Sequence, residues 1–441
     1  MSLLFVKKLK RQQKQINEMT NEEIQNIKSL INREVVLAMG CTEPVAVALA
    51  VTKSRETLGM LPEKVEVNLS KNIFKNAMGV GIPGTGMIGL PIAIAMGIVA
   101  GDSSRGLEVL DISADEVEKA KKWLDDNKDK ISIQIKSTTE KLYVECICHY
   151  GNSSATAAIA QQHTNFVRIE KDDKILFDKP IETNQTNTNQ PEVKLSMAKV
   201  YKFATQTPIE ELSFIKETIR YNTEAAKEGA KGYGLHTGKI LLDIANGDVV
   251  HTTIAKTVAA SDARMDGCTK PVYSNSGSGN QGITCTLPIY EYGIQKNLPD
   301  ETITRGLILS HLTSIYVKQG IGRLSALCGI VNASIGVAAG FTYLQGGNLE
   351  QISFAIKNLI NTIAGMVCDG AKPSCALKIT TGLYSAFVSS ELAINNKVVD
   401  ATDGISEPNV DYSIANLGKL GHDGMNDADD MILNIMTNKR L

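Results

Sequence analysis

The sequence predicts an α+β protein in which a mainly helical domain carries an inserted, smaller α+β module. Three observations lead to this prediction. A chain of 441 residues is long enough for two or three domains. Residues 301–390 consist of long apolar segments of helical length, whereas residues 105–207 contain short alternating segments that are typical of strands. We therefore expect a tail at residues 1–20, a main domain built from residues 21–104 and 208–441, and the module at residues 105–207.

The composition excludes several classes of protein. A net charge of −2 provides no basic surface for nucleic acid or for an anionic membrane, so neither is expected as a partner. Eight cysteines in a chain of this length do not form a disulfide framework; they indicate reduced thiols in the cytoplasm, some of them candidate ligands. Two uncharged runs, residues 76–101 and 324–347, are long enough to span a bilayer, but they are rich in Gly, Ala and Ser and lack flanking aromatic belts. We predict that both are buried core segments.

The start of the chain contains a tail and two predicted helices. In residues 1–20 the apolar start precedes the basic run, which is opposite to the order in a signal peptide and indicates a frayed tail or a surface helix. Apolar residues at helical spacing predict a helix over residues 21–38, capped by Asn21 and ended by Gly40. A proline that suits a first helical turn predicts a second helix over residues 44–58.

Cys41 lies between these two helices, just before the N-terminus of the second. The dipole and the free N–H groups of a helix N-terminus favour a thiolate. We therefore expect an activated thiol at Cys41. The alternative is a buried structural cysteine at a helix junction, and the local sequence does not separate the two.

A glycine-rich loop follows a strand that is predicted over residues 64–69. Residues 79–91 contain five glycines, which indicates a tight loop that another group approaches closely. A helix over residues 91–100 is expected next. The loop has neither the Gly-Lys-Ser/Thr of a phosphate loop nor a GxGxxG pattern, so nucleotide binding is not expected.

The expected module begins with a charged amphipathic helix over residues 113–127. Segments that alternate like strands follow at residues 131–136, 142–148, 166–170 and 174–177, with a strand or a short helix at 155–161. Residues 183–190, rich in Thr, Asn and Gln, are predicted to be a flexible loop. We expect Cys146 and Cys148, on one predicted strand, to point to opposite faces, where they could not share a metal ion.

A second Gly-Cys-Thr motif precedes a polar loop. Helices are expected over residues 209–229 and 238–260. Residues 266–272 echo the Gly-Cys-Thr-Glu-Pro-Val of residues 40–45, which suggests a weak internal repeat. In residues 274–282, Ser-Asn-Ser-Gly-Ser-Gly-Asn-Gln-Gly, successive N–H groups and hydroxyls could cradle an anion such as a carboxylate. The alternative is a flexible linker, but the amide side chains between apolar segments favour the cradle.

Three cysteines, Cys328, Cys368 and Cys375, lie at or near the ends of predicted helices. These helices are expected over residues 302–316, 321–344, 349–368 and 375–390. Small residues let backbones approach closely, so the three thiols could converge on a soft metal or an iron–sulfur cluster. The alternative is three buried free cysteines, and the spacing alone favours it, because the gaps match no short ferredoxin or zinc-finger pattern. Lys378 lies three residues after Cys375 on the same predicted helix.

Four motifs of this chain resemble the L-cysteine desulfidase family, the group that also contains serine dehydratase-like proteins. They lie at residues 39–44, 82–86, 274–282 and 370–378, and the resemblance extends from about Asn21 to the C-terminus. It implies a [4Fe–4S] enzyme that splits L-cysteine into pyruvate, sulfide and ammonia without pyridoxal phosphate. Similarity to the iron–sulfur L-serine dehydratases is looser.

The resemblance also implies roles for individual residues. The cluster ligands would be Cys328, Cys368 and Cys375, which leaves one iron free as a Lewis acid for the substrate thiolate. Cys41 would be the catalytic cysteine and, as a thiolate, would remove the α-proton. Separately from the resemblance, and from the cradle that the sequence suggests, we assign the substrate carboxylate to the polar loop, at Ser276, Gly277, Ser278, Gly279 and Asn280. Lys378 would add a positive charge there, or it is an ordinary solvated lysine.

The expected partner is therefore a small amino acid, L-cysteine, and the candidate assembly is a homodimer. One alternative is an L-serine dehydratase, in which hydroxide leaves in place of sulfide. Another is a non-catalytic protein that binds or carries iron–sulfur clusters or sulfur. Turnover of cysteine would separate the enzymes from the carrier.

Overall fold

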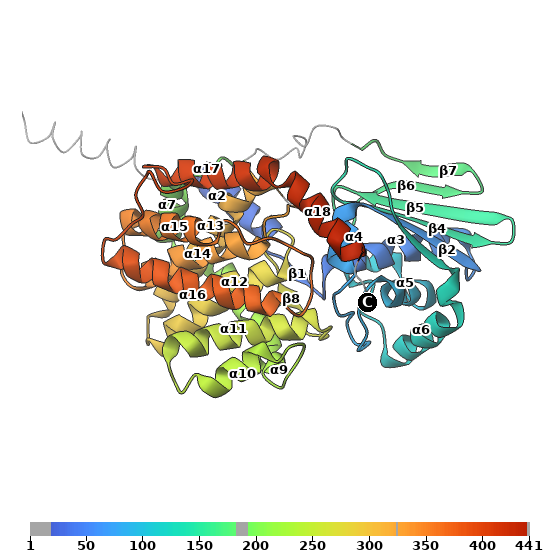
Figure 1. The fold of residues 1–441 in the computed structure, drawn as a ribbon, viewed down its shortest axis with the longest axis horizontal. Helices are drawn as coiled ribbons and strands as arrows, with labels where there is room; N and C mark the ends of the chain where they lie inside the picture. The colour runs from blue at the N-terminus through green and yellow to red at the C-terminus, as the bar shows by residue number, and fades with distance from the viewer. Residues whose placement is uncertain (1–18, 182–192, 323–324, 439–441) are drawn as a thin grey trace, which may run out of the picture.

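The computed structural model describes residues 19–181, 193–322 and 325–438, and it consists of two units that lie side by side (Figure 1). One unit is almost entirely helical, and the other contains a large sheet, so the fold class is α+β as predicted. The predicted loop at residues 183–190 and almost all of the predicted tail at residues 1–20 lie outside the described residues.

The second unit is built around a six-stranded sheet with the strand order β3-β2-β4-β5-β6-β7. β2 and β3 are parallel, and the other neighbouring strands are antiparallel. Helix α3 packs on β4 and β5, α5 packs on α3, and α6 packs on α5 (Figure 1). The strands are β2 (Lys64–Leu69), β3 (Ile131–Ile135), β4 (Tyr143–Tyr150), β5 (Ser153–Ala160), β6 (Phe166–Lys171) and β7 (Lys174–Asp178). The helices are α3 (Thr42–Leu58), α4 (Lys71–Ala77), α5 (Leu90–Val99), η1 (Ser103–Glu108), α6 (Ala114–Asn127) and η2 (Lys128–Lys130).

Alternating burial explains why these segments form one sheet with a single apolar face. In β4 every second side chain is buried, among them Val144, Cys146 and Cys148. Residues two apart on a strand point to the same face, so our expectation that Cys146 and Cys148 face opposite ways is wrong. Their sulfur atoms lie 4.0 Å apart beneath α3. The segment at residues 155–161, which the sequence allowed as a strand or a helix, lies in strand β5 up to Ala160.

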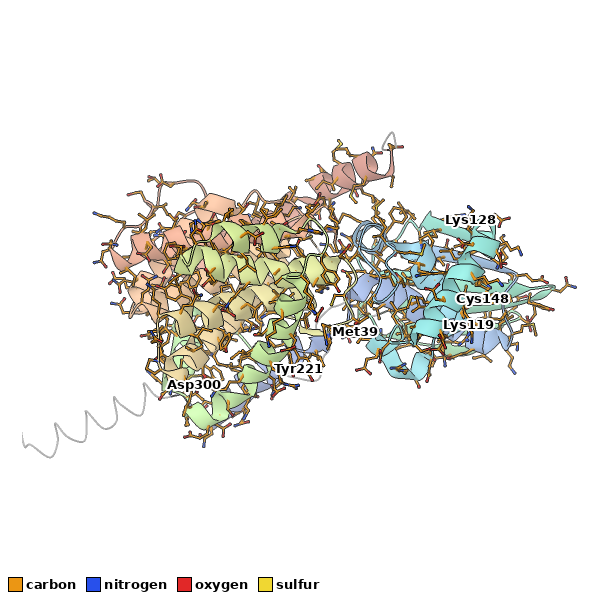
Figure 2. The ribbon with its side chains drawn as sticks, turned by 90° about the horizontal axis from the view of Figure 1, so that it is seen from below. Met39, Lys119, Lys128, Cys148, Tyr221 and Asp300 are labelled. Carbon is orange, nitrogen blue, oxygen red and sulfur yellow. The ribbon has the colours of Figure 1, made fainter. Side chains whose placement is uncertain are left out.

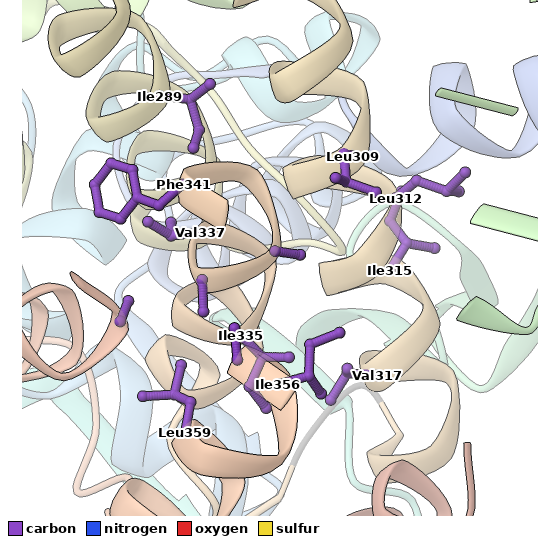
Figure 3. Packing of buried hydrophobic residues seen from close by; sticks show 14 of the residues in the cluster. Ile289, Leu309, Leu312, Ile315, Val317, Ile335, Val337, Phe341, Ile356 and Leu359 are labelled. Atoms are coloured by element: carbon purple, nitrogen blue, oxygen red, sulfur yellow. The ribbon is translucent and has the colours of Figure 1, made fainter. Parts of the chain in front are cut away.

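The helical unit surrounds α14 (Gly329–Leu344), which contacts α12, α13, α15 and α16. Their apolar side chains meet in one core, where Figure 3 shows residues such as Ile289, Leu312, Ile335 and Ile356. A side chain on Gly336 of α14 would overlap the carbonyl oxygen of Ser310, so α13 and α14 approach closely at this glycine.

The remaining helices of this unit agree with the predicted helical regions but divide some of them. The predicted helix at residues 238–260 is broken at Asn246 and Gly247, which both have positive φ angles. The helices are α2 (Asn21–Glu34), α7 (Met197–Gln206), α8 (Ile209–Leu212), η3 (Ser213–Lys216), α9 (Glu217–Gly229), α10 (Thr237–Ile244) and α11 (Val249–Met265). They continue with α12 (Gly279–Gln295), α13 (Asp300–Ile321), α15 (Leu349–Ile363), α16 (Cys375–Ile394), α17 (Val410–Lys419), the π-helical turn η4 (Leu420–Gly424) and α18 (Asn426–Thr437).

The first predicted helix is shorter than expected because its end pairs as a strand. Thr20, not Asn21, caps α2, and Glu23 completes a capping box. The last residues of the predicted helix form β1 (Leu37–Ala38), which pairs antiparallel with β8 (Val272–Tyr273). Local periodicity could not reveal this pairing, because the partner strand lies much later in the chain.

The sheet does not follow the boundary that we placed between residues 104 and 105. β2, α3, α4 and α5 precede this point, yet they share one core with the strands and the helix that follow it. Conversely α7, which we placed in the module, packs in the core of the helical unit. The chain also returns at its end, where α18 contacts α4 of the other unit (Figure 1).

In the part of the chain that the structure describes, no helix combines the length and the apolar character that crossing a bilayer requires. The uncharged runs at residues 76–101 and 324–347 instead supply buried side chains to the two cores, through α5 and α14. This placement agrees with their prediction as core segments.

Candidate active site

Cys328 and Cys368 lie on two neighbouring segments that hydrogen-bond to each other. The N–H of Cys328 donates to the carbonyl of Met366 at 2.9 Å, and the N–H of Cys368 donates to the carbonyl of Ala326 at 2.6 Å. Cys328 is also the N-cap of α14. These backbone bonds hold two thiols side by side, although the residues are far apart in the sequence.

The thiols of Cys328 and Cys368 interact, and this interaction separates their pKa values. It is the largest influence that lowers the pKa of Cys368, to about 6; burial opposes it, and Lys75 and Lys378 assist it. The same interaction, followed by burial, raises the pKa of Cys328. The pair therefore favours the thiolate form at Cys368.

Cys375 is the first residue of α16 and lies close enough to Cys368 for the two to interact electrostatically. Burial is the largest cause that raises its pKa. Its thiol donates to the carbonyl of Gly370 at 3.6 Å. The structure thus brings the three predicted ligands into one region. Among the described His, Cys, Asp and Glu side chains, however, no three are arranged so that they could hold a single metal ion.

The side chain of Lys378 bonds to the loop beside Cys368. It forms an ion pair with Asp369 and donates to the carbonyl of Val367 at 2.9 Å. Burial would raise the pKa of Asp369, but its bonds to Lys372 and Lys378 outweigh burial and lower this pKa to about 2. Lys378 is therefore not an ordinary solvated lysine, and its charge is balanced by Asp369.

Cys41 is the N-cap residue of α3, as expected, but it is not an activated thiol in this structure. The side chain is buried, and its thiol donates to a carboxylate oxygen of Glu43 at 2.9 Å. Burial and then the charge of Glu43 raise the pKa of Cys41 well above its ordinary value, and the opposite influence of Arg264 does not offset them. Burial and Glu43 therefore oppose the influence of the helix N-terminus, which favours a thiolate.

Glu43 accepts hydrogen bonds from three neutral groups. The Thr42 hydroxyl donates to one carboxylate oxygen at 3.2 Å, beside the thiol of Cys41, and the Asn76 amide donates to the other at 3.1 Å. Burial would raise the pKa of Glu43, but nearby His163 and the bond from Cys41 lead the influences that lower it. A buried carboxylate thus stays charged next to the candidate catalytic thiol.

Arg264, near the C-terminal end of α11, is a residue that our sequence reasoning missed. Its guanidinium donates to the carbonyl of Gly40 at 2.9 Å and to the side-chain oxygen of Asn280 at 3.1 Å. It packs so closely on Gly279 that any side chain there would overlap it. The available signal was an arginine inside a run of small residues, Ala-Ala-Ser-Asp-Ala-Arg, where a charge is expensive to bury.

The predicted cradle is the N-terminus of α12. Ser276 and Gly277 have positive φ angles, of 49° and 82°, and turn the chain into the helix, whose N-cap is Ser278. The Ser276 hydroxyl donates to Asn275 at 2.9 Å, so its side chain is already used. Asn280 accepts from Arg264. The loop is therefore ordered by its own contacts and is not a flexible linker.

The candidate site lies where four helices begin. Their N-caps, for α3, α12, α14 and α16 in turn, are Cys41, Ser278, Cys328 and Ser374. The Thr42 hydroxyl donates to the carbonyl of Gly277 at 3.5 Å and joins α3 to α12, while Gln281 of α12 packs against Gly329 of α14. Figure 2 places Met39, just before Cys41, at the junction of the two units. Helix N-termini favour negative charge, so this junction suits thiolates and carboxylates.

A cavity of about 380 Å³ lies elsewhere, behind the short β1–β8 ribbon. Its lining residues come from α2, from β1 and β8, and from the segment around Phe214 and Thr218. None of the three cysteines lines this cavity, and neither does Cys41. It is separate from the chemistry of the junction.

Comparison with known proteins shows to which family the chain belongs. The family model described as the serine dehydratase alpha chain matches residues 104–434. A UPF0597 protein of Bacteroides fragilis is 49% identical over 428 residues, which cover 96% of this chain and 100% of the relative. A UPF0597 protein of Phocaeicola vulgatus is 51% identical over 95% of this chain and 98% of the relative. One of Aeromonas hydrophila is 42% identical over 93% of this chain and 96% of the relative. The chain therefore belongs to the serine dehydratase alpha-chain family, in which it is similar to the UPF0597 proteins.

Proposed function

We propose that this chain is an iron–sulfur lyase that eliminates sulfide from L-cysteine to give pyruvate, hydrogen sulfide and ammonia. The observation that supports the proposal is that Cys328, Cys368 and Cys375 lie near enough to interact, and that Cys41, like Cys328 and Cys375, stands at a helix N-terminus. Membership of the serine dehydratase alpha-chain family supports the coarser part, a dehydratase-type lyase. Loss of a β-thiol and loss of a β-hydroxyl from an amino acid are the same type of elimination.

The three cysteines fit a [4Fe–4S] cluster by the chemistry of their donor atoms. Thiolates are the usual ligands of such clusters, and two helix N-termini together with Lys75 and Lys378 favour negative charge here. Held by these three cysteines, such a cluster would supply an iron without a protein ligand, which would act as a Lewis acid for the β-substituent.

In this proposal Cys41 accepts the proton from the α-carbon. Its thiol must first release to water the proton that burial and Glu43 retain on the sulfur. A cationic substrate group beside Glu43 would neutralise that carboxylate and lower the pKa of Cys41. The α-proton then moves to the Cys41 sulfur, the bond between the β-carbon and sulfur breaks, and sulfide leaves. The resulting aminoacrylate reacts with water to give pyruvate and ammonia.

The test begins with anaerobically purified full-length protein. We expect iron and acid-labile sulfide in the wild type and their loss in Cys328→Ala, Cys368→Ala and Cys375→Ala, because each variant lacks one thiolate ligand. Cys285→Ala, which removes a buried thiol in α12, is the matched control and should retain the cluster. Full iron and sulfide in all three variants would refute the ligand assignment.

L-serine is the second candidate substrate, because the family model that matches this chain is that of the serine dehydratase alpha chain. Pyruvate formation with L-cysteine and L-serine, measured side by side on the same preparation, decides between them. Higher kcat/KM for L-cysteine supports the desulfidase, and the reverse supports the dehydratase. Cluster-loaded protein that forms pyruvate from neither would favour a carrier of clusters or sulfur.

A further inference from the structure

Two buried side chains of opposite charge flank Cys41 without an ion-pair partner. Arg264 is 4% exposed and Glu43 is 9% exposed. Within the described residues, neither side chain lies within 4.0 Å of a charged group of opposite sign. The two side chains do not form an ion pair with each other either. Burial of an uncompensated charge is expensive, so each side chain is incomplete in the structure as it stands.

Arg264 has donor capacity that the protein does not use. Its two terminal nitrogens donate to Gly40 and Asn280, but its Nε is buried without any hydrogen-bond partner. A guanidinium presents a planar fork of donors that matches a carboxylate, and the N-terminus of α12 lies beside it at Gly279. The missing partner of Arg264 is therefore an anion with the geometry of a carboxylate.

Glu43 is a buried carboxylate that lacks a cationic partner within 4.0 Å among the described residues. Within the described residues its hydrogen-bond donors are Cys41, Thr42 and Asn76, which are all neutral, and His163 acts on it electrostatically. A carboxylate that accepts from a thiol can exchange that weak donor for a stronger one, such as an ammonium. The missing partner of Glu43 is therefore a cation.

Arg264 and Glu43 lie on either side of the Cys41 thiol. Glu43 is hydrogen-bonded to Cys41, and Arg264 is bonded to Gly40, the preceding residue. Both charges act on Cys41 electrostatically, in opposite directions. An α-amino acid carries a carboxylate and an ammonium on one carbon, so it can satisfy both side chains at once and place the Cα–H beside the sulfur.

We propose that Arg264 and Glu43 bind the two charged ends of the substrate, with Arg264 on the α-carboxylate and Glu43 on the α-ammonium. This assignment rests on the proposed function and adds to it the group that each side chain recognises. It places the carboxylate next to Asn280 and Gly279 of the predicted cradle. It also leaves Lys378, which Asp369 neutralises, outside substrate recognition.

The experiment separates the two ends of the ligand. Elimination is slowed by on the order of a hundredfold or more in anaerobically purified Cys41→Ala protein. L-cysteine, 3-mercaptopropionate (without the ammonium) and cysteamine (without the carboxylate) can therefore be titrated calorimetrically before much L-cysteine is consumed. Adding Arg264→Gln should lower the affinity for 3-mercaptopropionate on the order of tenfold to a hundredfold and leave the affinity for cysteamine within about twofold. Adding Glu43→Gln should lower the affinity for cysteamine by a similar factor and leave the affinity for 3-mercaptopropionate unchanged. The affinity for L-cysteine should fall in both double variants.

Arg55 provides the matched control. Its guanidinium also donates to two carbonyls and has a buried Nε without a partner, but it lies 3.7 Å from Glu56 in an ion pair. Arg55→Gln should change none of the three affinities. Arg264→Lys, which keeps the charge and loses the fork, should fall between the wild type and Arg264→Gln for 3-mercaptopropionate.

Two results would overturn the assignment. One is an equal loss of 3-mercaptopropionate and cysteamine affinity in each variant. The other needs no substitution at Arg264 or Glu43, and so decides even if those variants fail to fold: Cys41→Ala protein that binds either analogue as tightly as L-cysteine. If pyruvate still forms from L-cysteine in the wild type, either result refutes this assignment alone, whereas absence of turnover with any amino acid refutes the proposed function.

Discussion

At the scale of single residues, Cys41 shows two opposing influences on one thiol. The N-terminus of α3 favours a thiolate, but a buried sulfur that donates to Glu43 keeps its proton. Burial and the neighbouring carboxylate together outweigh the helix N-terminus. A base at this position must therefore be activated when the substrate arrives.

Cys41→Ala separates the roles of base and ligand. The variant should keep iron and acid-labile sulfide, yet the elimination should slow by on the order of a hundredfold or more, which is the usual contribution of a positioned general base. Cys41→Ser should be nearly as poor, because a hydroxyl stays protonated at neutral pH. Exchange of the substrate α-proton with deuterium, followed by NMR, measures the step directly. Exchange at the native rate in Cys41→Ala would contradict the assignment, and loss of iron would make Cys41 a cluster ligand.

His311 is a second residue whose protonation the fold controls. It is fully buried in α13, and burial lowers its pKa to about 3. Asn275 donates to its Nδ1 at 3.1 Å, and Nε2 lies 3.0 Å from the hydroxyl of Thr286, which itself donates to a carbonyl. These partners suit a neutral ring with the proton on Nε2. Because Asn275 belongs to the polar loop, this ring also supports the start of α12.

We expect His311 to make the protein sensitive to mild acid. In the unfolded chain a histidine binds a proton near pH 6.5, whereas in the folded protein His311 does so only near pH 3. Its contribution is complete above about pH 6.5 and is lost as the pH falls toward 3, with a full size on the order of 4 kcal/mol. Thermal unfolding of His311→Gln should depend less on pH between 6.5 and 5 than that of the wild type. An unchanged dependence in His311→Gln would be the contrary result.

At the scale of elements, small residues determine how closely α13 and α14 pack. Gly336 faces the carbonyl of Ser310, and Gly340 faces Ile289 of α12. The same composition made this run resemble a membrane span in the sequence. In the structure it serves close packing between buried helices, which is what glycine permits when backbones approach.

Gly336→Ala tests this packing. A methyl group here would overlap the Ser310 carbonyl, so we expect a loss of about 1–3 kcal/mol in the free energy of unfolding, measured by urea denaturation. Gly365→Ala is the control, because nothing lies within 4 Å of the added carbon, and it should change stability by less than about 0.5 kcal/mol. Equal effects of the two substitutions would show that α13 and α14 have room to separate.

At the scale of the whole molecule, the last helix ties the two units together. Lys75 of α4, whose side chain is only 2% exposed, forms an ion pair with Asp429 of α18, whose side chain is 20% exposed. Lys71 forms a second pair with Asp430 at 2.6 Å, but both partners are more than half exposed, at 52% and 61%. Only the first pair leaves a buried charge behind if it is broken.

Asp429→Ala should therefore release α18, whereas Asp430→Ala should not. We expect the first substitution to cost on the order of 2 kcal/mol or more and the second less than about 1 kcal/mol. Limited proteolysis should cut near the C-terminus much faster in Asp429→Ala than in the wild type. If both variants were cut at the same rate, the buried pair would not be what holds α18 in place.

Much of the local structure could be predicted from the sequence. Alternation predicted the strands of the sheet, apolar spacing predicted most helices, and the family resemblance singled out the three cysteines that the structure brings into one region. The sheet crosses the boundary that we expected between residues 104 and 105, because β2 pairs with strands that lie beyond it in the chain. The pairing of β1 with β8 was missed for the same reason. Periodicity reports on neighbours along the chain and carries no information about partners far from it.

The sequence by itself determined the fold class and the short motifs that mark the family, since these depend on composition and on spacing within one segment. Only the tertiary structure decided the environment of each motif. It buried Cys41 beside Glu43, committed Lys378 to Asp369, and brought Arg264 to the start of α12. Burial and charge are properties of the space around a side chain, so the reactivity of these residues depends on contacts between segments that the chain order keeps far apart.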